Sequence, residues 1–395
     1  MNCYDDLVYR GLIKDMTNNE DFIERLNAGG MTFYWGTDPT ADSLHIGHYS
    51  SLLTCKRLAK YGHHPILLVG GATGLIGDPR PTGERSILAV DTLNHNLECL
   101  SKQVKSIVGE GTKIVNNYDW TKDMDVMTFL RDVGKYVNIN YMLDKDIIKR
   151  RLETGITFAE FAYTLLQGYD FYYLFEHENC IMQAAGQDQW GNITTGVDLI
   201  YKKTGKNAYA FTMPLILDAN GKKIGKSEGN ALWLDKEKTS PYTLYQFYYN
   251  TPDSKVEEYL KVFTFLTKEE IESCMEAHLA CPEKHLAQKT LAYEFVKELH
   301  GEEEANKARE TSEKIFRGEV SEDMPSVKIK GDSMNILDIL VESNLCPSKS
   351  EARRLVEQGG IVVDDDKISD PSQIVDKKSF ILHKGKKKII KIEVE

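Results

Sequence analysis

The chain has 395 residues, of which 41% are hydrophobic and 28% are charged, and its formal net charge is −11. This length exceeds one ordinary hydrophobic core, so we expect two or three domains. No run of about 18 apolar residues is present, and the start lacks the pattern of a signal or transit peptide, so we expect neither a membrane span nor export. The seven cysteines are scattered and never spaced as C-x-x-C, which predicts reduced thiols, a cytoplasmic location, and no zinc site or disulfide framework.

Positive charge is concentrated near the C-terminal end. Residues 333–395 contain eleven Lys or Arg and eleven Asp or Glu, so the net charge of −11 lies in the residues before them. Within that segment, residues 377–395 hold seven Lys against two Glu. Such a stretch can bind a polyanion locally, although charge alone favours a solvated surface.

The N-terminal half alternates short β-rich runs with helical stretches. The runs are at 31–35, 65–69 and 180–184, and the helical stretches are at 46–61, from about 85, and at 192–202. This alternation predicts an α/β fold with a parallel sheet.

The residue composition and the spacing of apolar residues change after Lys226. Residues 239 to about 316 have Glu, Lys, Ala and Leu at helical spacing, which predicts an α-helical domain. Residues 318–332 are polar, apart from a short alternation at 327–329, and are expected to be a linker. A small α+β module follows, with a helix capped by Ser348 or Ser350 and ended by Gly359-Gly360. The predicted boundaries are therefore an α/β domain at 1–228, a helical domain at 229–318, a linker at 319–332 and a C-terminal module at 333–395.

The first chemical signal is the string from Thr37 to His48, TDPTADSLHIGH. A strand ends in a turn and a helix opens at His45, so free backbone N–H groups at the helix start suit a phosphate. His45 and His48 share one helical face, and Gly47 lets a flat ring lie against the backbone. The alternative is two surface histidines at a helix start.

The second signal is the string KIGKS at residues 223–227. Lys223, Lys226 and Ser227 form a basic loop of the kind that folds over a triphosphate and neutralises charge on departing oxygens. The string alone is common, and it is not a P-loop because the required earlier glycine and strand are not convincing.

Together the two strings resemble the HIGH and KMSKS signatures of class I aminoacyl-tRNA synthetases. Further strings resemble the bacterial-type tyrosyl-tRNA synthetases, in the same order over nearly the whole chain: 34–43, 69–79, 118–120, 129–135 and 188–193. The resemblance implies a Rossmann-like catalytic domain at 1–228. It also implies that the chain activates tyrosine with ATP and transfers it to the terminal ribose of its tRNA.

The resemblance also implies a tyrosine pocket. Tyr34 and Asp170 match the residues that hold the substrate phenol, Tyr163, Gln167 and Asp78 match those that hold its α-amino group, and Gln189 lies close by. The spacing gives partial support, because Tyr163, Gln167 and Asp170 fall on one helical face and buried polar groups need partners. The alternative for this stretch is a tyrosine-rich core stripe.

The ATP site comes from the same resemblance. The residues that match nucleotide contacts are Gly36, Asp38, Gly47, His48, Asp188 and Lys226. Those that match groups acting on the phosphates are Thr40, His45, His48, Arg85, Lys223, Lys226 and Ser227, so His48 and Lys226 belong to both sets. Two positions depart from the family pattern. Trp35 stands where a small Cys is common, and the loop 78–85 is one residue shorter and lacks a Lys, for which Arg80 is a hypothetical substitute.

The C-terminal module resembles a small RNA-binding domain first named in a small-subunit ribosomal protein, on the residues 347–356 and 360–364. The resemblance implies that tRNA contacts come from the helix and the basic run: Lys349, Arg353, Arg354, Lys386, Lys387 and Lys388. It further implies a homodimer with Phe158 in the interface.

ATP is expected as a substrate accompanied by Mg²⁺, and no carboxylate cluster suggests a dedicated protein metal site. Two other classes remain open: a non-catalytic RNA-binding or splicing protein built on a synthetase scaffold, and a synthetase for tryptophan or another adenylate-forming enzyme. The intact signatures argue against the first, and Tyr34 with Asp170 favours a phenol over an indole.

Overall fold

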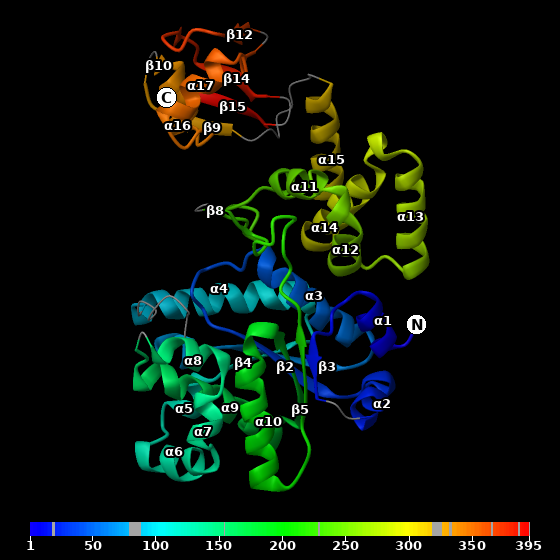
Figure 1. Ribbon diagram of the computed structural model, residues 1–395, viewed down its shortest axis with the longest axis vertical. Coiled ribbons are helices and arrows are strands. Elements are labelled where there is room, and N and C mark those ends of the chain that lie inside the picture. Colours follow the sequence, from blue (N-terminus) through cyan, green and yellow to red (C-terminus); the bar gives the residue numbers. More distant parts are fainter. Residues whose placement is uncertain are drawn as a thin grey trace. The chain divides into compact units, whose positions relative to one another are not determined.

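The computed structural model describes residues 1–17, 20–78, 88–153, 155–227, 230–317, 326–331, 334–364, 366–385 and 388–394. The chain divides into two compact units (Figure 1). The first contains residues 1–238 and 251–287, and the second contains residues 239–250 and 288–395.

The first unit is built on a six-stranded sheet of order β1-β6-β5-β2-β3-β4. The strands are β1 (Asp15–Met16), β2 (Thr32–Thr37), β3 (His64–Val69), β4 (Lys113–Asn116), β5 (Cys180–Gly186) and β6 (Tyr209–Met213). All neighbours are parallel except β1, which pairs antiparallel with β6. The chain thus builds outward from β2 through β3 and β4 and then returns to the other side of β2, which is the strand order of a Rossmann-like fold. The predicted α/β class is confirmed.

The helices that follow these strands begin near their predicted positions. Those of the α/β part are α1 (Cys3–Tyr9), α2 (Glu20–Ala28), α3 (Ile46–Lys60), α4 (Val90–Val108), α5 (Tyr118–Thr121), α6 (Val126–Asp132), α7 (Ile139–Leu143), α8 (Asp146–Leu152), α9 (Phe158–Glu178) and α10 (Trp190–Thr204). The helix expected from about residue 85 begins at Val90, and residues 79–87 lie outside the described part. A short antiparallel pair, β7 (Lys226–Ser227) and β8 (Asn230–Ala231), follows β6.

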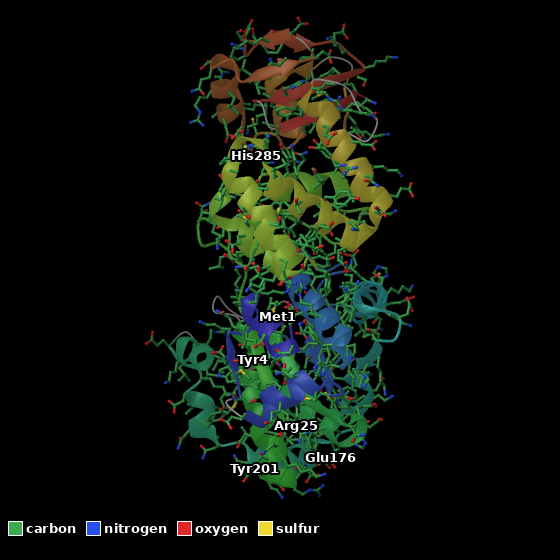
Figure 2. The ribbon with its side chains drawn as sticks, turned by 90° about the vertical axis from the view of Figure 1, so that its right-hand side faces the viewer. Met1, Tyr4, Arg25, Glu176, Tyr201 and His285 are labelled. Carbon is green, nitrogen blue, oxygen red and sulfur yellow. The ribbon has the colours of Figure 1, made fainter. Side chains whose placement is uncertain are left out.

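Helix α2 is attached to the sheet through Tyr209 on β6. Arg25, which is labelled in Figure 2, belongs to α2. Its guanidinium lies 5.6 Å from the centre of the Tyr209 ring and pairs with Asp21 at 2.9 Å. The Tyr209 hydroxyl also donates to Asp21. These contacts link α2 to β6, the strand next to the edge strand β1.

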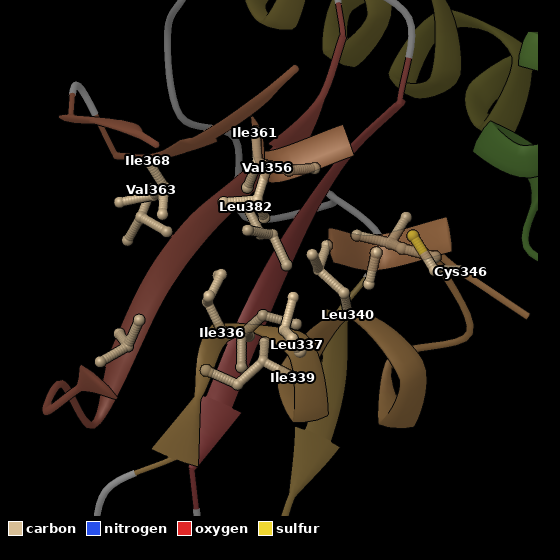
Figure 3. Packing of buried hydrophobic residues seen from close by; sticks show 14 of the residues in the cluster. Ile336, Leu337, Ile339, Leu340, Cys346, Val356, Ile361, Val363, Ile368 and Leu382 are labelled. Atoms are coloured by element: carbon tan, nitrogen blue, oxygen red, sulfur yellow. The ribbon is translucent and has the colours of Figure 1, made fainter. Parts of the chain in front are cut away.

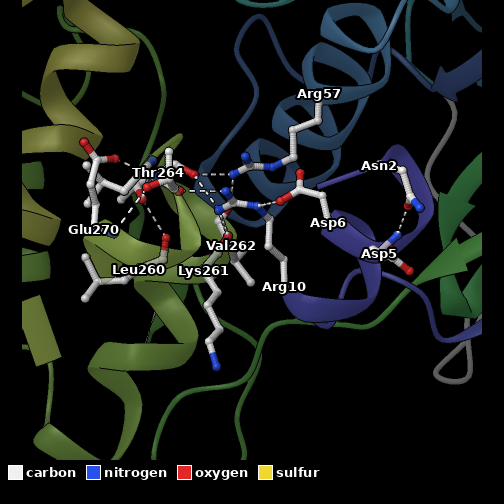
Figure 4. A network of polar contacts seen from close by, with 12 residues as sticks. Asn2, Asp5, Asp6, Arg10, Arg57, Leu260, Lys261, Val262, Thr264 and Glu270 are labelled. Carbon is white, nitrogen blue, oxygen red and sulfur yellow. Dashed lines mark hydrogen bonds and ion pairs between the residues drawn. The ribbon is translucent and has the colours of Figure 1, made fainter. Parts of the chain in front are cut away.

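Two further helices, α12 (Asp253–Phe263) and α13 (Lys268–Ala280), belong to the first unit, although they fall inside the stretch predicted as a separate helical domain. Two buried arginines attach them (Figure 4). Arg10 pairs with Asp6 at 2.7 Å and donates to the carbonyls of Lys261 and Leu266. Arg57, on α3, donates to the carbonyls of Val262 and Thr264. These cations satisfy carbonyls at and just beyond the end of α12, where no intrahelical donors remain.

The N-terminal part of the second unit is formed by α11 (Pro241–Tyr249), α14 (Leu286–His300), whose first two residues count with the first unit, and α15 (Glu302–Phe316). The rings of Tyr248 on α11 and Phe295 on α14 lie with centroids 4.1 Å apart. Gln246 donates to Ser312 on α15 at 2.7 Å. Aromatic packing and this hydrogen bond hold the three helices together.

The C-terminal part of the second unit is an α+β module. Its strands are β9 (Ser326–Ile329), β10 (Met334–Asn335), β11 (Ile361–Val363), β12 (Asp366–Ile368), β13 (Ile374–Val375), β14 (Ser379–Lys384) and β15 (Lys388–Val394), and its helices are α16 (Ile336–Glu342) and α17 (Lys349–Glu357). The main sheet has the order β12-β11-β14-β15-β9. Leu337, Leu340, Val356, Leu382 and their neighbours form its buried core (Figure 3). The N-cap of α17 is Ser348, whose side chain accepts from the Glu351 N–H.

One predicted boundary is wrong. Residues 326–329 were expected to lie in the linker, but they form β9, which pairs in parallel with β15. Ile329 is buried in the core of the module, so the short apolar alternation at 327–329 supplies an edge strand. Among the described residues, no helix combines the length and apolar character that crossing a lipid bilayer requires.

Candidate active site

A cavity of about 340 Å³ lies at the carboxyl ends of the parallel strands, where β2 and β5 end. The strand order reverses at this pair of strands, and open α/β sheets bind ligands at such a point. Every predicted tyrosine-site and ATP-site residue whose side chain is described lines this cavity: Tyr34, Gly36, Asp38, Thr40, His45, Gly47, His48, Asp78, Tyr163, Gln167, Asp170, Asp188, Gln189 and Lys223. Trp35 lines it too. Arg80 and Arg85 lie outside the described residues, and Lys226 and Ser227 are described only as backbone in β7.

One end of the cavity holds buried polar atoms that lack partners. Tyr34 on β2 and Gln183 on β5 are neighbours across the sheet and are each 2% exposed. The Tyr34 hydroxyl, Gln183 Oε1 and Gln167 Oε1 have no hydrogen-bond partner within the described part of the chain. An unpaired buried polar group costs about 1–3 kcal/mol, so this end of the cavity is suited to a ligand that supplies donors and acceptors.

Asp170, on α9, is the charged group at the same end. Its Oδ2 accepts from Asn117 Nδ2 at 3.0 Å and its Oδ1 accepts from Trp120 Nε1 at 2.9 Å. Burial raises the pKa of this carboxyl to about 7, while those two hydrogen bonds act in the opposite direction. The two donors hold the carboxylate in place, and Asp170 and Tyr34 both line the cavity and interact electrostatically.

A second carboxyl, Asp78, is held by two amides. It accepts from Gln189 Nε2 at 2.9 Å and from Asn192 Nδ2 at 3.2 Å. Asn192 is itself fixed by the Thr164 hydroxyl, which donates to its Oδ1 at 2.8 Å. Burial raises the pKa of Asp78 to about 6. The site thus contains two carboxyls whose ionisation lies near neutral pH.

A hydrogen-bond chain connects Asp170 to Asp38. Asn117 donates to Thr73 Oγ1 at 3.0 Å, and the Thr73 hydroxyl donates to Asp38 Oδ1 at 2.8 Å. The Tyr163 hydroxyl donates to Asp38 Oδ2 at 3.1 Å. Residues predicted for different parts of the substrates, Tyr163 and Asp38, therefore contact each other directly.

The two histidines of HIGH cap helix α3. His45 is the N-cap residue, and its Nδ1 accepts from the Gly47 N–H at 3.0 Å. The His48 Nδ1 accepts more weakly from the His45 N–H at 3.4 Å, and the two rings lie with centroids 4.0 Å apart. Because Nδ1 acts as an acceptor, a neutral His45 ring carries its proton on Nε2, which makes Nε2–H a donor.

The HIGH and KIGKS strings lie against each other. Gly225 has φ +87°, and a Cβ there would approach Ile46 Cγ1 to 2.7 Å and the Gly47 N to 3.2 Å. A Cβ on Gly47 would meet the His45 ring at 2.8 Å and the Ile224 carbonyl at 3.2 Å. Both glycines therefore permit a close backbone approach that other residues would prevent. The Lys223 ammonium lies 3.9 Å from Asp188.

The predicted tRNA-contact residues lie on the C-terminal module. Arg353 and Arg354 are exposed on α17. Lys349 pairs with Asp338 on α16. Lys386 and Lys387 lie outside the described residues, and the side chain of Lys388 is not described.

Several site residues have no role in the sequence prediction. Asn117, Trp120, Thr73 and Asn192 complete the polar network, and Gln183 adds an unpaired amide oxygen. Thr73, Trp120 and Asn192 lie inside strings that resemble the family, and Gln183 is the single polar residue in the otherwise apolar run 180–184. Asn117 carries no such signal, and it meets its partners because the fold brings distant segments together.

Comparison with known proteins agrees with this geometry. The family described as tRNA synthetases class I (W and Y) matches residues 26–317, and the Tyrosine–tRNA ligase SYY-like C-terminal domain matches residues 317–392. The tyrosine–tRNA ligase of Geobacillus stearothermophilus is 43% identical over 98% of this chain and 98% of the relative. That of Bacillus pumilus is 44% identical over 97% of both chains.

Solved structures give the same result. A C-terminally truncated mitochondrial tyrosyl-tRNA synthetase from Aspergillus nidulans superposes with a TM-score of 0.72 at 32% identity, over 80% of this chain and 94% of that one. A tryptophanyl-tRNA synthetase from Encephalitozoon cuniculi, at 14% identity and a TM-score of 0.55, shares the fold over 77% of this chain and 87% of its own.

The fold and the family matches define the chain as an aminoacyl-tRNA synthetase of class I. Within that class the chain belongs to the tyrosine–tRNA ligase family. The predicted family and enzyme class are confirmed, and ATP is the substrate that this family implies.

Proposed function

We propose that this chain joins tyrosine to its tRNA and that the cavity at the ends of β2 and β5 is where tyrosine and ATP react. The observation that carries the proposal is the set of unpaired polar atoms on Tyr34, Gln167 and Gln183 beside the buried carboxyl of Asp170. A phenol hydroxyl can donate to Asp170 and accept from the Tyr34 hydroxyl, which satisfies both groups. A phenyl ring would leave both groups unpaired, and an indole, whose N–H can donate to Asp170 but cannot accept, would leave the Tyr34 hydroxyl without an acceptor.

The α-amino group of tyrosine is assigned to the second carboxyl, Asp78, with Tyr163, Gln167 and Gln189 around it. ATP is assigned to another part of the cavity. The residues that line this part are Gly36 in β2, Asp38, His45, Gly47, His48 and Asp188. The phosphates of ATP would then lie by the start of α3, where the positive end of the helix dipole favours anions.

The first step is nucleotidyl transfer. An oxygen of the tyrosine carboxylate bonds to the α-phosphorus of ATP, the bond from that phosphorus to the bridging oxygen breaks, and pyrophosphate leaves with the electron pair. The carboxylate is already ionised, so no general base is required. Catalysis therefore depends on positioning and on charge stabilisation by Thr40, His45, Lys223 and the proposed Arg85, Lys226 and Ser227. In the second step the terminal ribose hydroxyl of tRNA attacks the tyrosyl carbonyl and AMP leaves.

Replacing His45 with alanine is expected to slow adenylate formation by about 10²-fold, with little change in the dissociation constants of tyrosine and ATP. The His45 Nε2–H donor acts on charge that develops only as pyrophosphate departs. Single-turnover kinetics measures this, and His64→Ala, an exposed histidine at the opposite end of β3, serves as the control. A raised KM with an unchanged rate constant contradicts the assigned role.

Tyrosine affinity is expected to fall as pH decreases from 8 to 5.5. The phenol and ammonium groups bind the ionised forms of Asp170 and Asp78, whose pKa values are about 7 and about 6. Below each pKa, binding must displace a proton, so the dissociation constant rises by up to about tenfold per pH unit for each carboxyl. Calorimetry over this range measures the effect, and the steepest part should disappear in Asp170→Asn. A dissociation constant that stays flat between pH 8 and 6 contradicts the assignment.

The direct test is amino-acid-dependent exchange of pyrophosphate into ATP. Tyrosine should support exchange, whereas phenylalanine and tryptophan should not. Exchange with tryptophan alone would mean a synthetase for a different amino acid, and no exchange with any amino acid would leave a non-catalytic RNA-binding protein.

The remaining assignments complete the proposal. Mg²⁺ enters bound to ATP. The C-terminal module binds the tRNA. The reaction takes place in the cytoplasm, where tRNA and ATP are present. The functional division remains a catalytic part at 1–228 and a helical part at 229–318, with the RNA-binding module extended to include β9.

A homodimer is supported by apolar side chains exposed on α6, α7 and α9: Val126, Met127, Ile139 and Phe158 are 65–75% exposed. Large apolar side chains that are this exposed are expected where a protein interface covers them. Light scattering of the protein in solution should give twice the chain mass of 44.9 kDa, and Phe158→Asp should reduce it.

A further inference from the structure

Helix α4 carries two amide side chains on its buried side. The helix buries Leu93, Leu100, Val104 and Ile107 as an apolar stripe. Asn96 is 5% exposed and lies in that stripe, and Gln103 is half-buried two turns later on the same face. Apolar side chains would fill these positions without the cost of burying an amide.

Both amides hydrogen-bond to the loop that joins β2 to α3. Asn96 Nδ2 donates to the Pro39 carbonyl at 3.0 Å. Gln103 Oε1 accepts from the Leu44 N–H at 2.7 Å, and its Nε2 donates to Ser43 Oγ at 3.1 Å. The loop is therefore held near both of its ends by one rigid helix.

This loop presents Thr40 and ends at His45, and both residues line the cavity. Leu44 immediately precedes His45. Its N–H is held by Gln103, and its carbonyl accepts from the Leu234 N–H at 2.8 Å. The residue after His45 is held as well, because the Ile46 N–H donates to the Leu232 carbonyl at 2.9 Å. On the other side of the loop, Pro39 immediately precedes Thr40.

We propose that Asn96 and Gln103 are positioning residues for adenylate formation. Gln103 acts through Leu44 to place His45, and Asn96 acts through Pro39 to place Thr40. Neither amide is among the residues that line the cavity, so both act only through the loop. The inference rests on the proposed function of the same cavity.

The test uses Gln103→Leu and Asn96→Leu, which keep approximate volume and apolar packing but remove the hydrogen bonds. We expect the single-turnover rate constant for adenylate formation to fall about 10- to 100-fold, because a misplacement of about 1 Å costs that much. The dissociation constant of tyrosine should stay within twofold, since Tyr34 and Asp170, which bind the phenol, lie on β2 and α9, and only Tyr163 contacts the loop, at Asp38. The exposed Asn94→Leu on the same helix is the matched control and should behave like the wild type.

Two further variants separate positioning from general stability. Gln103→Glu keeps an acceptor for the Leu44 N–H and should recover most of the rate. In a His45→Ala background, Gln103→Leu should lower the rate constant by less than about twofold, because its effect passes through His45. The same non-additivity is expected between Asn96→Leu and Thr40→Ala.

Three results would overturn the proposal. The first is an unchanged rate constant in folded Gln103→Leu. The second is a double variant of Gln103→Leu and His45→Ala whose rate constant falls by the full product of the two single-variant reductions. The third is a variant that melts at a lower temperature and has fewer active sites, counted from the amplitude of adenylate formation in a single turnover, but a normal rate constant at each site. That result would mean a purely structural role. Failure of the proposed function is recognised separately, because the wild-type protein would then show no tyrosine-dependent pyrophosphate exchange.

Discussion

Replacing Asp170 with alanine is expected to weaken tyrosine binding by about 10- to 150-fold. The lost interaction is a hydrogen bond to a charged acceptor, worth about 1.5–3 kcal/mol. The change also removes the acceptor of Trp120 Nε1 and one of the two acceptors of Asn117 Nδ2, which keeps its bond to Thr73. ATP affinity should change little because Asp170 lies at the end of the cavity next to Tyr34.

Calorimetry with tyrosine and with phenylalanine measures the effect. The wild type should prefer tyrosine strongly, and that preference should shrink in Asp170→Ala because the acceptor for the phenol has gone. Asp198→Ala, an aspartate about two-fifths exposed on α10 and paired with Lys202, is the matched control. If Asp170→Ala binds tyrosine within twofold of the wild type, the phenol lies elsewhere.

Ending the chain after Arg317 is expected to leave tyrosine adenylation nearly intact and to abolish charging of tRNA. Helix α15 ends at Phe316 and the second family match begins at residue 317. A cut at residue 331 would leave β9 behind without its partner β15, so the earlier position is the cleaner one. The removed piece holds the exposed Arg353 and Arg354, while every described residue that lines the cavity remains.

Three measurements on the truncated protein decide this prediction: pyrophosphate exchange, tRNA charging and the melting temperature. A full-length variant with Arg353→Gln and Arg354→Gln is the control, and it should charge tRNA more weakly with a flatter dependence on salt. Normal charging by the truncated protein would refute the RNA-binding role. A lower melting temperature with loss of both activities would mean that the module only stabilises the rest of the chain.

Much of the fold could be predicted from local patterns. Buried parallel strands such as β3 and β5 are nearly continuous apolar runs, and α17 begins at Ser348, a residue type that caps helices. The strand β9 was missed because four residues of weak alternation form an edge strand only when a partner is present. The attachment of α12 and α13 to the first unit was missed as well, since it depends on Arg10 and Arg57, which lie far away in the sequence.

The candidate site could also be predicted only in part. The positions of Tyr34, Asp170 and His45 followed from strings that resemble a family, and the cavity contains all three. The partners that hold them could not be predicted, because Asn117, Thr73 and Gln103 reach their acceptors only through the order of strands and the packing of α4. The link between Tyr163 and Asp38 spans 125 positions and has no local signature.

The arginine pair at the end of α12 has a consequence for synthesis of the protein. Arg10 lies 251 to 256 positions before the carbonyls that it serves, and Arg57 lies 205 to 207 before its own. A ribosome adds about 5–20 residues per second, so α1 is complete roughly 13 to 50 seconds before its last acceptor exists. A guanidinium buried without those acceptors would be strongly unfavourable. The first helix of the chain is therefore expected to be among the last to reach its final packing.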